Sequence, residues 1–302
     1  MSTDQAVFAQ LQQSRREFLA LVGELRPQLH RYCARMTGSI ADGEDVVQDT
    51  LARAYYELGE LKELPAMRAW LFRIAHNRAL DFLRRYDVRM GEEFDTVADT
   101  TAAADPGPEE ALARDQAVHA AVSRFLELVP AQRSCVILKD VLGHSAEEIG
   151  VLTGQSVPAV KAALHRGRAR LRDLAQETPS AAPRPVSAAL VRYAALFNAR
   201  DWDGVRAMLV DEVRLDLVAN WTTEGRERVG NYFGNYGRIA GWRVAPGWLD
   251  GREVLAVFKD THNERPGYFI ELTINGGRVA AIRDFRHVDY IGGEAAIVLT
   301  NQ

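Results

Sequence analysis

The chain has 302 residues, 47% of them hydrophobic and 26% charged, and a formal net charge of −4; this composition is typical of a globular protein with two or three domains. No run of 18 apolar residues predicts a membrane span, and the N-terminus lacks the pattern of a secretory signal, so we expect a cytoplasmic protein. Cys33 and Cys135 lie far apart without a cysteine or histidine cluster, which argues against a disulfide scaffold or a zinc site, and we expect no metal and no cofactor.

Residues 10–90 are predicted to form an all-helical domain, because apolar residues recur there at spacings of three and four. In the segment MRAWLFRIAHNRALDFLRR, one helical face collects aromatic, amide and charged groups. They are Trp70, Arg73, Asn77, Asp81 and Arg84. Such a set can stack on unpaired bases and hold a nucleic-acid backbone. An aromatic residue at helical spacing also fits a core position, so Trp70 has two interpretations.

Two linkers are predicted, an acidic one at 91–110 and a proline-rich one at 176–186.

The charge is strongly segregated along the chain: residues 91–128 carry nine acidic and two basic side chains, whereas residues 129–174 carry seven basic and four acidic ones. This asymmetry indicates a polyanionic partner for the basic part.

Residues 111–175 are predicted to form a second all-helical domain that contains a helix-turn-helix. Ser145 and Glu148 fit a capping box at the start of a short helix. Gly154 interrupts that helix, and Ser156 then caps a second, longer one.

The second helix of this motif carries two stripes. Its inward stripe is Val160, Leu164, Gly167, Leu171 and Leu174. Its basic stripe is Lys161, His165, Arg168 and Arg172, flanked by Arg166 and Arg170. In helix-turn-helix proteins the second helix enters the major groove, so we predict that these basic residues bind DNA; the alternative is a solvated charged face.

Residues 187–302 are predicted to form an α+β domain. A helical start is followed by segments that alternate apolar and polar residues, at 252–260 and 267–288. Asn275, Gly276 and Gly277 lie where a hairpin must turn.

Three segments together resemble the sigma-70 family of transcription factors. EEIGVLTGQSVPAVKAALHRGRARLR resembles region 4, ADGEDVVQDTLARAYYEL resembles region 2.2, and MRAWLFRIAHNRALDFLRR resembles regions 2.3 and 2.4. The chain is therefore similar to an extracytoplasmic-function (ECF) sigma factor over residues 15–175. The resemblance implies binding of core RNA polymerase, through its β′ and β subunits, and of promoter DNA at the −10 and −35 elements to initiate transcription.

The resemblance also implies roles for individual residues. Polymerase binding is expected at Asp45, Gln48 and Asp49. Recognition of the −10 element is expected at Lys62, Trp70, Arg73, Asn77, Asp81, Arg84 and Arg85, with the loop 59–67 capturing a flipped base. Recognition of the −35 element is expected at Ser156, Lys161, His165, Arg166, Arg168, Arg170 and Arg172. Ala162 and Ala163 stand where relatives often have basic or hydroxylated residues, and they either touch thymine methyl groups or leave fewer specific contacts. The acidic linker is either a solvated tether or a segment that enters a basic channel of the polymerase.

The third domain resembles the SnoaL-like fold, a cone-shaped barrel of curved sheet with helices. In some ECF sigma factors such an extension regulates activity, which implies an intramolecular contact with the sigma domains. A pocket for a small ligand of unknown identity is predicted at Trp221, Tyr232, Trp242, Trp248, Phe269, Asp284 and His287. The spacing of Asp284 and His287 places them on opposite faces of a regular strand. We expect no enzyme activity; the alternative is an enzyme or a small-molecule sensor that uses this pocket, with the helical part as an adaptor.

Overall fold

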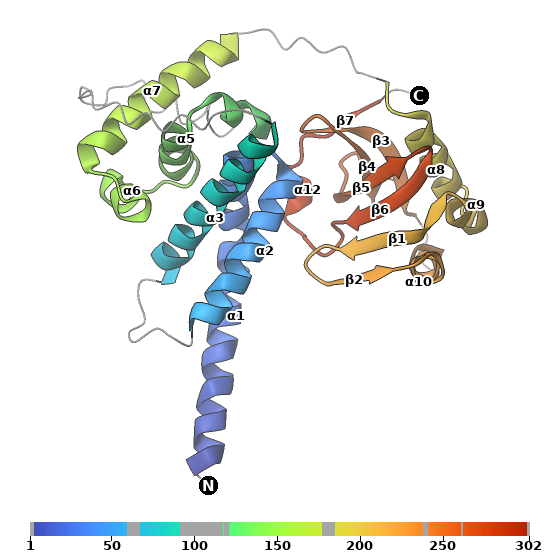
Figure 1. Cartoon of the computed structure of the whole chain (residues 1–302), viewed down its shortest axis with the longest axis horizontal. Coiled ribbons are helices and arrows are strands. Elements are labelled where there is room, and N and C mark those ends of the chain that lie inside the picture. The colour runs from blue at the N-terminus through green and yellow to red at the C-terminus, as the bar shows by residue number, and fades with distance from the viewer. Residues whose placement is uncertain are drawn as a thin grey trace. The chain divides into compact units, whose positions relative to one another are not determined.

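The computed structural model describes residues 3–58, 67–90, 117, 121–176, 185–237, 241–260 and 262–300. The chain divides into two compact units, Met1–Thr178 and Pro179–Gln302 (Figure 1). The described elements of the first unit are helical, as predicted: α1 (Thr3–Thr37), α2 (Ile40–Glu57), α3 (Met67–Met90), η2 (Val122–Glu127), α5 (Pro130–Val136), η3 (Ile137–Val141), α6 (Ala146–Thr153) and α7 (Val157–Gln176).

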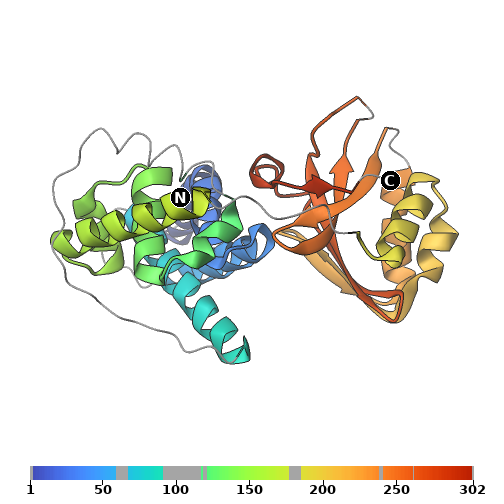
Figure 2. The same cartoon turned by 90° about the horizontal axis from the view of Figure 1, so that it is seen from above.

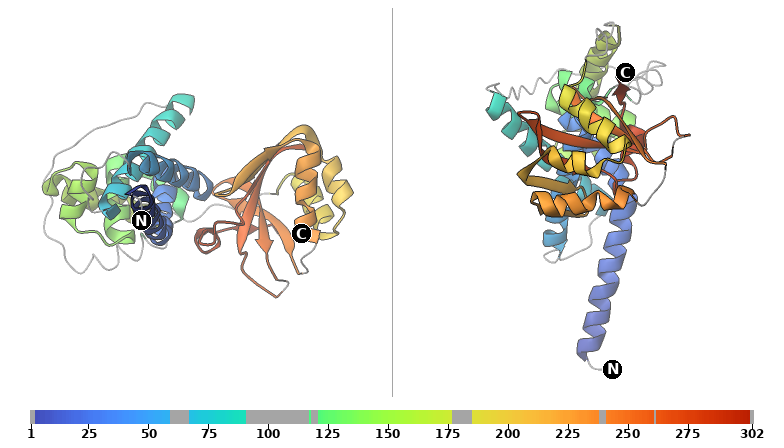
Figure 3. Two further views of the ribbon diagram at one scale, coloured as in Figure 1. Left: turned by 90° about the horizontal axis from the view of Figure 1, so that it is seen from below. Right: turned by 90° about the vertical axis from the view of Figure 1, so that its right-hand side faces the viewer.

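Helices α1, α2 and α3 pack together in the part of the chain predicted as the first helical domain. Ser39 caps α2, because its hydroxyl accepts a hydrogen bond from the Asp42 backbone N–H at 3.2 Å. Gly43 lets α2 approach α1 closely, since a Cβ atom there would lie 2.5 Å from the Ala34 backbone. The N-terminal turns of α1 extend beyond α2 and α3 (Figures 1 and 3).

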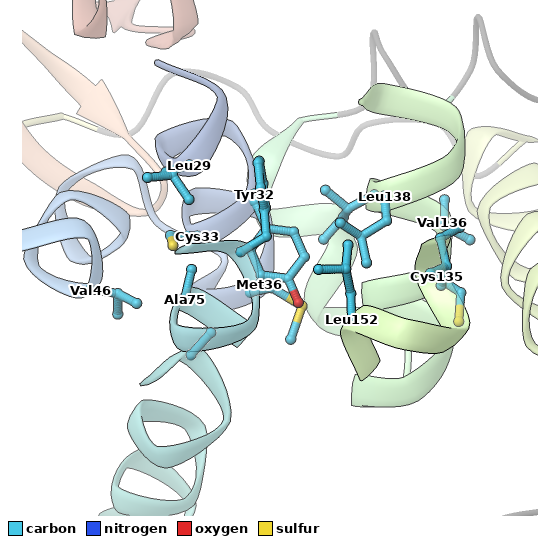
Figure 4. Packing of buried hydrophobic residues seen from close by; sticks show 14 of the residues in the cluster. Leu29, Tyr32, Cys33, Met36, Val46, Ala75, Cys135, Val136, Leu138 and Leu152 are labelled. Carbon is cyan, nitrogen blue, oxygen red and sulfur yellow. The ribbon is translucent and has the colours of Figure 1, made fainter. Parts of the chain in front are cut away.

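The two predicted helical domains share one apolar core. Tyr32 and Met36 of α1 belong to the same buried cluster as Leu138 of η3 and Leu152 of α6 (Figure 4). A buried arginine links the same parts, because Arg133 donates to the Met36 carbonyl at 2.5 Å. The composition of residues 91–110 predicts a linker between these domains. Composition alone does not show that the domains on either side of the linker pack against each other. Much of that acidic linker lies outside the described residues.

The second unit is α+β, as predicted. Its strands are β1 (Leu209–Leu217), β2 (Trp221–Glu224), β3 (Arg243–Leu249), β4 (Arg252–Phe258), β5 (Tyr268–Asn275), β6 (Arg278–Asp284) and β7 (Val298–Leu299). Its helices are α8 (Ala188–Asn198), α9 (Trp202–Ala207), α10 (Arg226–Tyr232), α11 (Gly234–Gly237) and α12 (Ile291–Glu294).

The seven strands form one curved sheet in the order β2-β1-β6-β5-β4-β3-β7. Neighbours pair antiparallel except β1 and β6, which are parallel. Helices α8, α9 and α10 lie on one side of the sheet (Figure 2), with α8 packed on β3 and β4 and α10 packed on β1 and β2. The expected arrangement of curved sheet and covering helices is confirmed, and the sheet stays open, because β2 and β7 are its two edges rather than a closing pair.

The predicted hairpin between β5 and β6 is confirmed. Asn275 pairs with Arg278, and Gly276 and Gly277 form the turn with φ values of 58° and 78°. Positive φ at both central positions is the geometry that glycine adopts without strain, and it matches the twist of the two strands.

Candidate nucleic-acid interface

The helix-turn-helix of α6 and α7 has the predicted local geometry. Ser145 accepts from the Glu148 N–H at 3.1 Å while Glu148 accepts from the Ser145 N–H at 2.7 Å, which completes the capping box. Gly154 ends α6 in the left-handed conformation, with φ 72°. Ser156 accepts from the Ala159 N–H at 3.3 Å and starts α7. The inward stripe of α7 that was predicted from spacing is buried in full.

The outer face of α7 presents part of the predicted basic stripe. Lys161, His165 and Arg170 are exposed, and so is Ser156 before the first turn. Arg166 and Arg172 are half-buried. Arg170 also forms an ion pair with Glu127 at 3.1 Å. The cationic surface is therefore most open near the N-terminal half of α7, the part of such a helix that reaches base edges.

Arg168 differs from its neighbours in the stripe. Its guanidinium donates two hydrogen bonds to Asp140, at 2.9 and 2.5 Å, and only 14% of its side chain is exposed. Asp140 lies in η3, a π-helical turn in which the Leu142 N–H bonds to the Ile137 carbonyl at 3.0 Å. A paired, largely buried guanidinium is not presented to phosphates. We therefore remove Arg168 from the predicted DNA-binding set; helical spacing had placed it on the outer stripe because the pairing partner comes from another element.

Ala162 and Ala163 are each only 3% exposed. They lie on the packed side of α7, so the predicted contact with thymine methyl groups is not available in this fold. The exposed basic residues around them remain predicted to bind DNA.

A groove lies between α2 and α3. It has a volume of about 210 Å³. Its lining contains four residues that helical spacing had grouped on one face and four that sequence reasoning missed. The predicted ones are Trp70, Arg73, Asn77 and Asp81, and the others are Arg53, Glu57, Ile74 and Arg78. The sequence does show that Arg53 and Glu57 share a helical face with Asp45 and Asp49, because they continue one i, i+4 series, but it does not show that this face meets α3.

Some charged side chains of this groove form ion pairs with each other, and others do not. Arg53 forms an ion pair with Glu57 one turn away. Asp81 lies 3.8 Å from Arg78 and 3.5 Å from Arg84.

Arg73 and Asn77 are exposed, and among the described residues no hydrogen bond or ion pair of either side chain is found. Trp70 is only 5% exposed, so it forms a wall of the groove and packs in the core at the same time. The groove therefore offers one guanidinium and one amide whose donors are not used.

The remaining residues predicted for the −10 element are placed differently. Arg84 and Arg85 are exposed beyond the groove, and Arg85 donates to the Asp81 carbonyl at 3.2 Å. Lys62 and the loop 59–66 lie outside the described residues.

The residues predicted to bind polymerase lie on α2. Asp49 is exposed, and Asp45 and Gln48 are half-buried. Glu44 beside them is fully buried and forms an ion pair with Arg26 of α1, so it has a structural role. These positions lead along α2 toward Arg53 and the groove.

A buried polar cluster joins α1, α3 and α5. The Tyr32 hydroxyl lies 2.7 Å from Nδ1 of His76 and 3.1 Å from the hydroxyl of Ser134. Burial lowers the pKa of His76 to about 4 and raises the pKa of Tyr32. Nearby, His144 lies edge-on to Phe72 at 5.4 Å, and burial lowers its pKa as well. We call Tyr32, His76 and Ser134 the seam cluster, because it links the region-2-like helices to the region-4-like ones.

The residues predicted to line a C-terminal pocket come together only in part: Tyr232 donates to Asp284, and Trp242 packs on Tyr236, which donates to the same carboxylate. Trp221 is 46% exposed on the edge strand β2, and His287 is exposed. Trp248 is half-buried. The other four, Tyr232, Trp242, Phe269 and Asp284, are buried. Asp284 ends β6 facing inward while His287 lies outside, and the two do not share a site.

Within the described part of the chain, no helix is long and apolar enough to cross a bilayer. Three or more metal-binding side chains do not cluster anywhere among those residues. The expectation of no cofactor stays a prediction.

Comparison with known proteins identifies the helical unit. The Sigma-70 region 2 family matches residues 21–89, and the Sigma-70, region 4 family matches residues 121–171. RNA polymerase sigma factor CarQ of Myxococcus xanthus is 32% identical over 152 residues, which is 50% of this chain and 84% of that protein. The chain belongs to the ECF sigma factors of RNA polymerase.

Two further comparisons extend past the helical unit. ECF RNA polymerase sigma factor SigG of Mycobacterium tuberculosis is 28% identical to this ECF sigma factor over 308 residues, covering 89% of this chain and 74% of SigG. The crystal structure of ECF sigma factor SigJ, also from Mycobacterium tuberculosis, aligns with 88% of this chain at 21% identity, covers 95% of SigJ, and has a TM-score of 0.36.

Proposed function

We propose that the groove between α2 and α3 of this promoter-recognising sigma factor binds the opened −10 strand. The observation that carries the proposal is the exposed pair of Arg73 and Asn77, which line the groove one helical turn apart. The other charged groups of the groove lie close to groups of opposite charge. A guanidinium with unused donors suits a phosphate, and an amide can pair with a base edge.

The groove suits a single strand better than a duplex. Opening a duplex exposes bases, and groups that hold unpaired bases and the backbone stabilise the open form. Trp70 supplies an aromatic wall at the level of Arg73, and the exposed Arg84 and Arg85 continue the positive charge along α3. Asn77 then reads or orients the base while Arg73 fixes the backbone.

We assign recognition of the −35 element to the N-terminal half of α7. Ser156, Lys161 and His165 are exposed there, and Arg166 is half-buried beside them. A helix in the major groove places such residues at base edges, while cationic side chains further along contact phosphates.

Asp45, Gln48 and Asp49 on α2 are assigned to core polymerase. Acidic side chains near the start of α2 present negative charge to a basic partner surface. Since α2 also lines the groove, polymerase binding and strand capture would occur on neighbouring parts of one helix.

The experiment is in vitro transcription with core polymerase and a promoter selected for this sigma factor. We expect Arg73→Ala and Asn77→Ala to reduce open-complex formation, measured by permanganate reactivity of the −10 region, while core binding is retained. The matched control is Arg192→Ala, which removes the same charge from an exposed position on α8. Open-complex levels that are equal in Arg73→Ala, Arg192→Ala and the unaltered protein would overturn the assignment of the groove.

We propose that the second unit regulates this activity by docking on the helical unit, and that the protein acts in the cytoplasm with the polymerase. The support is the α+β unit that follows the sigma regions in the same chain. A chain truncated after Ala175 should still bind core polymerase but transcribe at an altered level. An enzyme or sensor with the helical part as an adaptor is the second candidate, and it predicts that truncation leaves core-dependent transcription unchanged.

A further inference from the structure

The second unit contains a fully buried carboxylate that neutral donors hold. Asp284 at the end of β6 has no exposed surface. One of its oxygens accepts hydrogen bonds from the hydroxyls of Tyr232 and Tyr236, the latter at 2.5 Å, and the other accepts from the Arg286 backbone N–H at 2.9 Å. Burial raises the pKa of this carboxyl, whereas the two phenol donors favour its charged form. A charged Asp284 would make the surroundings attractive to a cation.

Two aromatic rings form a corner above this carboxylate. The rings of Tyr236 and Trp242 have centroids 4.8 Å apart and are inclined at 70°. The guanidinium carbon of Arg286 lies 5.4 Å from the Tyr236 centroid and 5.2 Å from the Trp242 centroid. Ring faces are electrostatically negative, so a cation that touches two of them is attracted from two sides. The occupant of the corner is thus a side chain of the same chain, only two residues after Asp284.

The ring of Tyr268, next to Tyr236, also has a cationic side chain over it. The hydroxyl oxygens of Tyr268 and Tyr236 lie 2.9 Å apart. The Lys259 ammonium lies 5.6 Å from the centroid of the Tyr268 ring. Two of the chain's own cations therefore lie over rings of one cluster.

The same geometry disfavours an anion as the ligand. An anion requires hydrogen-bond donors that point outward, but the hydroxyls of Tyr232 and Tyr236 donate inward to Asp284. What faces the corner from the aromatic side is the π surface of Tyr236 and Trp242, which recognises positive charge.

We propose that the corner between Tyr236 and Trp242 is a binding site for a small organic cation of the guanidinium or alkylammonium class, which Arg286 occupies as a tethered ligand. A free cation of this class binds when the Arg286 side chain swings out, and the charged form of Asp284, which the hydroxyls of Tyr232 and Tyr236 favour, supplies the compensating charge. Tethering gives Arg286 a high effective concentration, so it competes with any free ligand. Neither the groove nor α7 takes part in this site.

The test uses the full chain and methylguanidinium chloride, the head group of arginine, with sodium chloride at equal ionic strength as the blank. Binding is followed through the indole N–H signal of Trp242 in a ¹⁵N-labelled sample, assigned by its loss in Trp242→Phe. We expect Arg286→Ala to bind methylguanidinium saturably and about tenfold or more tightly than the unaltered chain, because the competitor is gone.

The matched control is Arg243→Ala. Arg243 also lies over a ring, with its guanidinium carbon 3.7 Å from the Phe258 centroid, but it is on β3, which β4 and β5 separate from β6 and Asp284. Its removal should leave the response of the Trp242 signal as in the unaltered chain. Asp284→Asn in the Arg286→Ala background should weaken binding about tenfold or more, since the charge behind the rings is lost. Arg286→Met, which keeps the length of the side chain, replaces Arg286→Ala if the latter does not fold.

Three results would overturn the proposal. Equal affinity in the unaltered chain and the Arg286 variants would show that Arg286 is not a competing occupant. No saturable shift of the Trp242 signal in Arg286→Ala or Arg286→Met would show that the corner does not take a free cation. An increase in Arg243→Ala that equals the increase in Arg286→Ala would place the site elsewhere.

Discussion

Arg168 shows how a residue in a stripe that is predicted to bind DNA can serve the fold instead. Its two hydrogen bonds to Asp140 fix α7 against η3, and Asp140 is only 2% exposed. Removing one partner of such a pair leaves a buried charge without compensation, and this is far more damaging than the loss of a surface charge. The basic stripe thus contains one residue, Arg168, that is packed in the fold, while others face the solvent.

We expect Arg168→Ala to reduce the free energy of unfolding by about 3–5 kcal/mol, measured by urea denaturation. Lys161→Ala, at an exposed position of the same helix, should change it by less than about 0.5 kcal/mol. If both variants lose the same stability, the pair with Asp140 does not have the structural role described.

His76 makes the helical unit sensitive to acid. Its pKa is lowered to about 4 by burial, below the ordinary value of about 6.5. The unfolded chain therefore binds a proton more readily than the folded one, so stability is complete above about pH 6.5 and falls as the pH decreases toward 4. Within that window each pH unit removes about 1.4 kcal/mol from this group alone.

His76→Asn should flatten the dependence of the melting temperature on pH between about 4 and 6.5. His165→Asn is the control, because His165 is exposed on α7. Since burial also lowers the pKa of His144, some acid sensitivity will remain in both variants. A pH profile of His76→Asn that is as steep as that of His165→Asn would contradict the assignment.

At the scale of elements, the turn between α6 and α7 depends on a backbone conformation. Gly154 has φ 72°, and a Cβ atom there would meet no other atom within 4 Å. The requirement for glycine is therefore conformational and not steric. Gly154→Ala should reduce the free energy of unfolding by about 1–2 kcal/mol, and Gly154→Asn by less, since asparagine tolerates this region better. Denaturation of the two variants side by side measures the difference; equal losses would point to another cause.

The elements of this chain could largely be predicted from its sequence, because their signals are local. The capping box at Ser145 and the glycine turn at 276–277 each involve neighbours in the chain, and both appear as predicted. The ion pair of Arg168 could not be predicted, since its partner Asp140 lies 28 residues away on another element. Arg53 and Glu57 were missed at the groove for the same reason: sequence shows which face they share on α2, but not that α3 lies opposite.

At the scale of the whole molecule, the helical unit combines the two surfaces that we propose to bind DNA in one core. Elements centred at −10 and −35 lie about 85 Å apart along a duplex with a rise of 3.4 Å per base pair. A compact domain of this size has a radius of gyration of only about 15 Å. One packed unit cannot cover both elements, so α7 and the groove must separate when the promoter is bound. The seam cluster stabilises the packed form and opposes that separation.

Tyr32→Phe should favour the separated form. It removes the hydroxyl that joins His76 and Ser134, and loss of a buried hydrogen bond costs about 1 kcal/mol. We expect faster amide exchange in α5 and α7, and tighter promoter binding in the presence of core polymerase. Tyr86→Phe, at an exposed position on α3, is the control. Faster exchange in Tyr32→Phe without any gain in promoter binding would mean that the seam cluster does not restrain function.

The same shared core has a consequence during synthesis. The Tyr32 hydroxyl meets Ser134 across 102 residues of chain, and a ribosome needs on the order of 5–20 s to add that many. For that time α1 has α2 and α3 to pack against, but the part of it that contacts η2, α5 and η3 has no partner. We therefore expect chaperones to bind the first hundred residues of the nascent chain, or neighbouring nascent chains to aggregate through them, before the protein is complete and can bind a promoter.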